Sequence, residues 1–271
     1  MWHLKTELMK YRPRVKKYRP VQKKRRPNAY FRFKRFTVWQ DQCGMKVTTD
    51  ACLFGGVVAE RVKNNPPRRI LDIGTGTGVL SMMMAQAIEA APIDAVEIDR
   101  AAWMQASANF SQSAWNQRLN AHFGPIQSFE AENFEDMGQR YDLIVCNPPF
   151  FKNHMRGQEE SRNRAVHNNE LPLEDVMASL QKFITPSGLA FVLLPYHEMI
   201  NFSNMMQQGG FHEVLEMPLF TQPGRPVFRT IKAFSPLAAS LKHKENLVIK
   251  DQDQNYTWRF SALMKDFYLN L

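Results

Sequence analysis

The sequence predicts an α/β fold in which a mostly parallel sheet carries helices on both faces. From about residue 68, short apolar runs alternate with segments of helical character. Strands that alternate with helices of about 10–15 residues form βαβ units, which place the strands side by side and parallel. Hydrophobic residues make up 44% of the 271 residues, which is enough to bury a core beneath such helices.

The elements of this sheet are expected in a regular order. The apolar runs that predict strands span residues 68–74, 92–99, 119–123, 140–146 and 187–195. The helical segments between them span residues 79–91, 100–115 and 171–184. After residue 210 the pattern changes to two strand-like runs, 211–217 and 228–234, joined by a loop rich in Pro and Gly. This arrangement predicts a hairpin that ends the sheet, followed by an apolar run, a turn and a helix over 258–271.

The charge of the chain is concentrated at its amino end. Lys and Arg number 35 and Asp and Glu 26, and residues 1–35 hold fourteen of the basic residues against one acid. We therefore expect residues 1–30 to be a flexible basic arm and residues 31–271 to be a single domain. Nucleic-acid phosphate is the favoured partner of the arm, through Lys23, Lys24, Arg25 and Arg26. A solvated tail and a nuclear-localisation-like segment are the alternatives.

Composition also argues against several classes of protein. No run of 18 apolar residues free of charge occurs, so a membrane span is not expected, and the residues after Met1 lack the apolar core of a secretory signal. Cys43, Cys52 and Cys146 are too few and too scattered for a disulfide framework or a zinc site. We expect no metal and a cytoplasmic protein with reduced thiols.

A glycine-rich loop follows the first predicted strand, in the sequence Asp72-Ile-Gly74-Thr-Gly76-Thr-Gly78. Glycines at such a point allow a tight turn and a close approach to a ligand. The GxGxG spacing differs from the GxGxxG of dinucleotide folds, and no GK[ST] follows. Asp72 would repel a pyrophosphate but suits a cationic ligand such as the amino group of a methionine moiety.

Glu97 ends the second predicted strand, where a carboxylate can accept both hydroxyls of a ribose. Asp99 is the rival candidate for this contact with the ribose. The alternative is that Glu97 is a solvated residue at a strand end with no role in binding. Together with Asp72 and the three glycines, Glu97 predicts a pocket for S-adenosyl-L-methionine rather than for NAD.

The tetrad Asn147-Pro148-Pro149-Phe150 follows the fourth predicted strand. Ligands of an open parallel sheet bind beyond the carboxyl ends of its strands, so the tetrad is expected beside the glycine loop. A planar amine is a poor nucleophile, and two acceptors on its hydrogens localise the lone pair of its nitrogen. The side-chain oxygen of Asn147 and the carbonyl of Pro148, held by a fixed φ, can be these acceptors. Phe150 would stack on the planar group.

These motifs, in this order, resemble the class I S-adenosylmethionine-dependent methyltransferases that modify planar nitrogen. The segments FTVWQDQCGMKVTTDACLFGGVV, NPPFF, DQNY and the final FYLNL resemble the bacterial tRNA1(Val) adenine-37-N6 methyltransferases. The likeness covers the chain from about residue 30 to its end. It implies a Rossmann-like fold, with a seven-stranded sheet whose last strand is antiparallel.

The resemblance also implies that Lys46, Thr49 and Asp50 help to close the cofactor pocket. The alternative is that Thr48 and Thr49 only cap a helix. One departure from the family pattern occurs after the third strand, where Pro125 stands in place of the usual acid. Gln127 is the candidate that would compensate by contacting the cofactor adenine.

Basic residues in two loops are further candidates for contact with RNA. The loop after the fourth strand carries Lys152, Arg156, Arg162 and Arg164, and the loop of the predicted hairpin carries Arg225 and Arg229. Solvated loops are the alternative in both places.

The sequence as a whole predicts methyl transfer from S-adenosylmethionine to N6 of adenine in tRNA, at position 37 of the anticodon loop, with no membrane and no obligate protein partner. A base flipped from a loop breaks no pairing. The alternatives are a protein glutamine-N5 methyltransferase, a DNA adenine methyltransferase, and a non-catalytic RNA-binding or ribosome-assembly module on the same fold.

Overall fold

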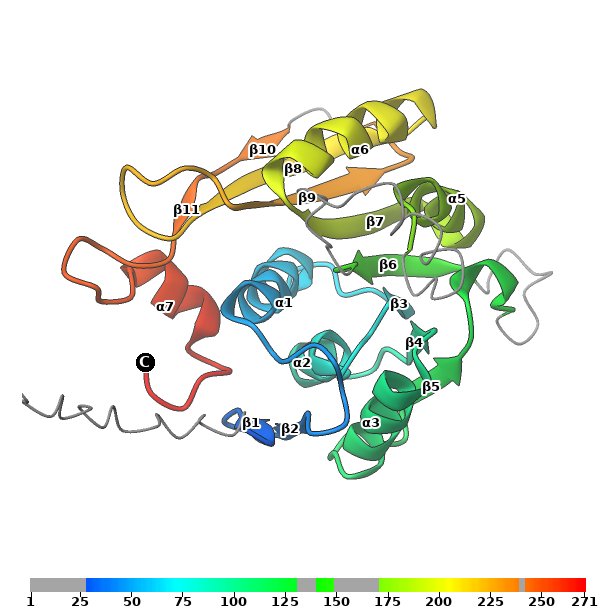
Figure 1. The fold of residues 1–271 in the computed structure, drawn as a ribbon. Helices are drawn as coiled ribbons and strands as arrows, with labels where there is room; N and C mark the ends of the chain where they lie inside the picture. Colours follow the sequence, from blue (N-terminus) through cyan, green and yellow to red (C-terminus); the bar gives the residue numbers. More distant parts are fainter. Residues whose placement is uncertain (1–27, 131–139, 149–170, 239–241) are drawn as a thin grey trace, which may run out of the picture.

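A computed structural model describes residues 28–130, 140–148, 171–238 and 242–271 of the chain. It confirms an α/β architecture, with a central sheet between two layers of helices (Figure 1). The predicted arm over residues 1–30 lies almost entirely outside the described residues. Among the described residues, no helix combines the length and the apolar character that crossing a bilayer requires.

The central sheet has seven longer strands. They are β3 (Ile70–Ile73), β4 (Ile93–Glu97), β5 (Leu119–Phe123), β6 (Tyr141–Cys146), β7 (Ile184–Leu194), β8 (His212–Phe220) and β9 (Arg229–Ser235). Across the sheet they lie in the order β5-β4-β3-β6-β7-β9-β8. All neighbours are parallel except that β9, the last of the seven, runs antiparallel between β7 and β8. The predicted antiparallel last strand is therefore confirmed.

Two further strands that the sequence pattern did not predict extend the sheet beyond β8. They are β10 (His243–Lys244) and β11 (Leu247–Val248), each two residues long and parallel to β8. The predicted hairpin is formed by β8 and β9, but it does not simply add to the edge of the sheet. Its second strand inserts beside β7, so that β8 becomes the outer member.

The sheet is covered by six helices of the described chain. They are α1 (Thr49–Val62), α2 (Val79–Ala87), α3 (Arg100–Ser111), α5 (Leu173–Phe183), α6 (Tyr196–Gln208) and α7 (Trp258–Met264), with a single 3-10 turn, η1 (Ile126–Ser128). Side chains of α1, α2 and α7 pack in one apolar cluster, and side chains of α5 and α6 pack in another on the opposite face. Alternate residues of β6 serve the two clusters, as a sheet covered on both faces requires.

Three helices end earlier in the chain than predicted. The predicted helix over 100–115 ends at Ser111, and the predicted helix over 258–271 ends at Met264. Helix α2 ends at Ala87 rather than at residue 91, because Ile88 is already extended on the way to Pro92. Helix α6 was not predicted at all.

A small ribbon stands outside the sheet. Strands β1 (Tyr30–Arg32) and β2 (Thr37–Trp39) pair antiparallel with each other and with no other strand of the described residues. The ribbon lies on the side of the molecule that carries α2 and α3 (Figure 1). Phe33 and Phe36, in the turn of the ribbon, stack on each other and join the core cluster of α1 and α2.

Candidate active site

The glycine loop joins β3 to α2 at the carboxyl edge of the sheet. Gly74, Gly76 and Gly78 have φ angles of 70°, 58° and 81°, which are left-handed values that other residues rarely adopt. A methyl group on Gly74 or Gly76 would meet no described heavy atom within 4 Å. At Gly78 it would lie 2.4 Å from the ring of Phe110. Two of the glycines thus border open space, and the third permits close packing of the loop on α3.

Asp72 lies beneath this loop and is fully buried. One carboxylate oxygen accepts hydrogen bonds from the hydroxyls of Thr75 and Ser81, at 2.6 and 2.7 Å. The other oxygen has no partner among the described residues. Burial raises the pKa of Asp72 to about 6, although the two hydroxyls oppose the shift. The carboxylate therefore holds the loop together from below, and its predicted contact with the amino group of a ligand stays a prediction.

Glu97 ends β4 next to the glycine loop. Its two carboxylate oxygens accept the backbone N–H groups of Gly76 and Asp99, each at 2.8 Å. Burial raises the pKa of Glu97, and the two backbone donors work against that shift. Asp99, the rival candidate, caps α3 by accepting the N–H of Ala102 at 2.8 Å. Glu97 is therefore the strand-end carboxylate that touches the loop.

The beginning of the Asn-Pro-Pro-Phe tetrad lies beside the glycine loop. Cys146 at the end of β6 is the register partner of Ile73 at the end of β3, so Asn147 and Gly74 are the next residues on neighbouring strands. Asn147 is half-buried and Pro148 is buried. Pro149 and Phe150 lie outside the described residues. The expectation that the two motifs meet at adjoining strand ends is confirmed for the part of the tetrad that the structure describes.

The residues around the start of α1 are tied to other parts of the chain. Thr48 caps α1 by accepting the N–H of Ala51 at 3.4 Å, so the helix-capping alternative holds for Thr48. Thr49 hydrogen-bonds with Tyr268 near the end of the chain. The ammonium group of Lys46 donates to the carbonyl of Gln40. Lys46 thus fastens the segment that precedes α1, and Thr49 ties the first residue of α1 to the end of the chain. Their predicted contacts with a cofactor stay predictions.

The other predicted site residues are more dispersed. Asp50 forms an ion pair with Arg229, with 3.3 Å between Oδ2 and Nε. Arg229 therefore holds the start of β9 against α1, while Arg225 is exposed in the hairpin loop. Gln127 donates to the carboxylate of Asp175 on α5 at 2.8 Å. The predicted RNA contacts outside the described residues are Lys23, Lys24, Arg25, Arg26, Lys152, Arg156, Arg162 and Arg164.

Two buried amides near the glycine loop were not predicted from the sequence. Asn109 of α3 bonds both the N–H and the carbonyl of Trp39, each at 2.9 Å, and it also donates to the carbonyl of Thr77 at 2.8 Å. Gln40 accepts the N–H of Val47 at 2.8 Å and donates to the carbonyl of Asn28 at 3.1 Å. These amides join β2, the loop over residues 40–47 and the glycine loop into one unit.

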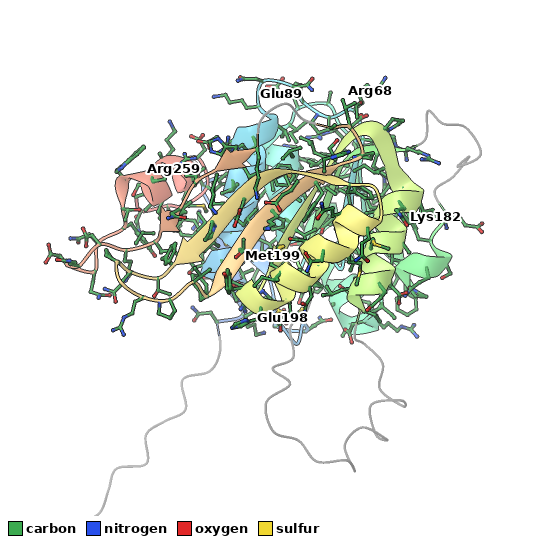
Figure 2. The ribbon with its side chains drawn as sticks, turned by 90° about the horizontal axis from the view of Figure 1, so that it is seen from above. Arg68, Glu89, Lys182, Glu198, Met199 and Arg259 are labelled. Carbon is green, nitrogen blue, oxygen red and sulfur yellow. The ribbon has the colours of Figure 1, made fainter. Side chains whose placement is uncertain are left out.

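A second polar cluster lies away from this edge and is structural. Asp94 accepts hydrogen bonds from Arg69, His122 and Tyr141, at 3.1, 2.9 and 2.8 Å. Arg69 precedes β3 and Tyr141 begins β6, so the cluster ties the amino ends of the strands together. In Figure 2, Arg68 marks the side of the molecule with the amino ends of the strands, and Glu198, near the start of α6, lies on the opposite side.

Comparison with known proteins agrees with this geometry. Residues 55–176 match the family model described as methyltransferase small domain. A crystal structure of a predicted O-methyltransferase from Agrobacterium tumefaciens has the same fold, with a TM-score of 0.60 and 14% identity, covering 82% of this chain and 99% of that one.

Two bacterial relatives carry the name tRNA1(Val) (adenine(37)-N6)-methyltransferase. The protein of Cytophaga hutchinsonii is 36% identical over 90% of this chain and 99% of its own length. The protein of Dyadobacter fermentans is 37% identical over 89% of this chain and 98% of its own length. Because identity exceeds 30% along nearly the whole length of this chain and of each relative, the chain belongs to the tRNA1(Val) (adenine(37)-N6)-methyltransferase family.

Proposed function

We propose that this protein transfers a methyl group from S-adenosylmethionine to N6 of adenine 37 in tRNA1(Val). The observation that carries the proposal is the juxtaposition of Asn147 and Pro148 with the glycine loop, set by the register of Cys146 with Ile73. The names of the relatives, at 33–37% identity, support the choice of substrate. We place the activity in the cytoplasm, where thiols such as the three unpaired cysteines stay reduced.

The residues at the carboxyl edge fit S-adenosylmethionine. Each oxygen of Glu97 accepts one backbone N–H and keeps a second lone pair, so the carboxylate has capacity for the two ribose hydroxyls. Gly74 and Gly76 leave open space in front of the loop, where a side chain would obstruct a ligand. When bound there, S-adenosylmethionine supplies an electrophilic methyl group on a sulfonium centre.

Asn147 and Pro148 would prepare the adenine amine. The side-chain oxygen of Asn147 and the carbonyl of Pro148 are two acceptors on consecutive residues, and in this proposal each accepts one hydrogen of the same amino group. Hydrogen bonds to both hydrogens draw the lone pair of N6 out of conjugation with the ring. No strong base is required before the attack, so catalysis depends mainly on positioning. Phe150, one residue beyond Pro149, supplies the ring on which the base stacks in this proposal.

tRNA is the partner that the proposal requires, with adenine 37 presented by the anticodon loop. A nucleotide in a loop leaves its stack without the loss of base pairs, which lowers the cost of bringing it to the strand ends. The basic residues of the sequence over 1–35 provide the charge that attracts the RNA backbone.

Replacing Asn147 tests the proposal. We expect Asn147→Ala to lower the turnover number for an unmodified tRNA1(Val) transcript by more than about tenfold, while the Kd for S-adenosylmethionine stays unchanged. Transfer of tritiated methyl measures turnover, and calorimetry measures cofactor binding. Asn201→Ala, on the exposed side of α6, is the matched control.

Mass spectrometry of the nucleosides released from the transcript identifies the product. The proposed function predicts N6-methyladenosine. Normal turnover in Asn147→Ala would contradict the acceptor role, and wild-type protein that methylates a glutamine of a protein but no transcript would contradict the choice of substrate.

A further inference from the structure

The β1–β2 ribbon has one buried face and one exposed face. Register pairs Tyr30 with Trp39 and Phe31 with Val38. Val38 is fully buried, and Phe31 packs against the same core cluster. Tyr30 and Trp39 point the other way, with 49% and 40% of their surface exposed. The inward face of the ribbon thus packs on the core, and the outward face leaves two neighbouring aromatic rings exposed to solvent.

The two exposed rings form a continuous aromatic surface. Their centroids are 5.3 Å apart and their planes are inclined by 57°. Arg32 follows Tyr30 by two residues on the same strand, so it shares the exposed face, and it is exposed. An aromatic surface bordered by a guanidinium group offers stacking and positive charge together, which is the combination that unpaired nucleotides require.

The surface is held rigidly although the ribbon stands outside the main sheet. Asn109, which is almost wholly buried, fixes both polar backbone groups of Trp39. The N–H of Gln40 donates to the carbonyl of Ala29 at 2.8 Å, and its side chain donates to the carbonyl of Asn28. The backbone on both sides of the aromatic pair is therefore fastened, which limits the backbone entropy that is lost when a ligand stacks on the rings.

The same contacts place the ribbon beside the proposed active site. The amide of Asn109 that donates to Trp39 also donates to the carbonyl of Thr77 in the glycine loop, at 2.9 and 2.8 Å. One side chain therefore separates the ribbon from the loop. The sequence over 1–27, which carries eleven Lys and Arg residues, is joined to the ribbon through Asn28 and Ala29.

We propose that the exposed face of the β1–β2 ribbon, formed by Tyr30, Trp39 and Arg32, binds unpaired nucleotides of the RNA substrate by stacking. This inference rests on the proposed function and extends it to a second region of contact. The positive charge along residues 1–35 selects a polyanion over a neutral apolar partner. Stacking tolerates any base, so the surface contributes affinity for single-stranded RNA and does not read a sequence.

Four variants of the full-length protein separate stacking from other roles. Tyr30→Leu and Trp39→Leu remove a ring and keep an apolar side chain, whereas Tyr30→Phe and Trp39→Phe keep a ring. We expect each Leu variant to raise the Kd for an anticodon-loop oligonucleotide about tenfold, and each Phe variant to stay within about twofold of wild type. Trp258→Leu is the matched control, because Trp258 is a 79% exposed aromatic residue at the start of α7 and is not part of the ribbon.

Salt dependence distinguishes this surface from the charged segment that precedes it. Loss of a ring should leave the slope of log Kd against log salt concentration unchanged, whereas deletion of residues 1–27 should flatten it. Fluorescence anisotropy with the labelled oligonucleotide, with a paired RNA duplex of equal length and with the tRNA1(Val) transcript gives all of these values. Circular dichroism checks folding, and Tyr30, the more exposed of the pair, decides the matter if a Trp39 variant does not fold.

Three results would overturn the inference. They are unchanged affinity in the Tyr30→Leu variant, equal losses in the Leu and Phe variants, and an equal loss for the duplex. Wild-type methylation of the transcript is measured in the same preparations, so failure of the ribbon proposal is distinguishable from failure of the proposed function.

Discussion

Replacing Gly78 with Ala tests how the glycine loop is packed. Gly78 caps α2 with φ of 81°, and a methyl group there would lie 2.4 Å from Cε1 and 3.0 Å from Cζ of Phe110. Phe110 belongs to the core cluster and is 3% exposed, so its ring has little room to move. The substitution therefore adds steric overlap to an unfavourable backbone conformation.

The two costs can be separated with a second glycine. A left-handed conformation costs an alanine about 1–2 kcal/mol, and overpacking of a core adds about 1–3 kcal/mol. Gly210 has φ of 84°, and a methyl group there would meet no described heavy atom within 4 Å. We expect Gly210→Ala to lower the free energy of unfolding by about 1 kcal/mol and Gly78→Ala by about 3 kcal/mol, so the difference reports the overlap with Phe110.

Urea titration followed by circular dichroism measures both variants. A third variant, Phe110→Leu, shortens the side chain that the new methyl group meets. In the Gly78→Ala background it should cost at least about 1 kcal/mol less than in the wild type, because it relieves the overlap. Equal destabilisation by the two glycine substitutions, together with additive effects of Gly78→Ala and Phe110→Leu, would refute the packing argument.

Two further predictions concern charged groups. Burial raises the pKa of Asp72 from 3.8 to about 6, so the stability that its protonated form contributes is complete below about pH 4 and is lost as the pH rises through 6. Relative to Asp72→Asn, which does not titrate, the wild type should lose about 2 kcal/mol of unfolding free energy between pH 4 and pH 7, and a difference independent of pH in urea titrations would contradict this. A double-mutant cycle on Asp50 and Arg229, whose side chains are 20% and 28% exposed, should give a coupling of about 0.5–1 kcal/mol that decreases in 1 M NaCl. Coupling that is insensitive to salt would indicate that packing, and not charge, joins α1 to β9.

The positions of the main strands along the chain were predictable because they follow from patterns that are local in sequence. The runs that end at Gly74, at Glu97 and just before Asn147 form strands buried on both faces, and such runs are continuous and mostly apolar. The β1–β2 ribbon was missed because each of its strands has only three residues. Helix α6 was missed because it mixes polar and apolar residues and begins directly after the fifth predicted strand.

The site was predictable where backbone geometry demands a particular residue type. Left-handed φ angles require the glycines of the loop, and the end of β4 places Glu97 beside them. The contacts of Gln40 and Asn109 were not predictable, because a buried amide in the middle of a helix or after a strand has no signature in sequence. These contacts also join residues that are far apart in sequence: Trp39 and Asn109, which hydrogen-bond to each other, are separated by 70 positions.

Glu97 shows why a residue can be predicted to face a ligand and yet be found bonded within the protein. Its carboxylate accepts the N–H of Gly76 and the N–H of Asp99, so it already sets the distance between the glycine loop and the start of α3. Because each oxygen retains a lone pair, these bonds do not compete with the ribose hydroxyls that we assign to it. The backbone bonds instead hold the carboxylate in one orientation before a ligand arrives, which lowers the entropy lost on binding. In the proposed complex, the same two oxygens of Glu97 would serve both the fold and the site.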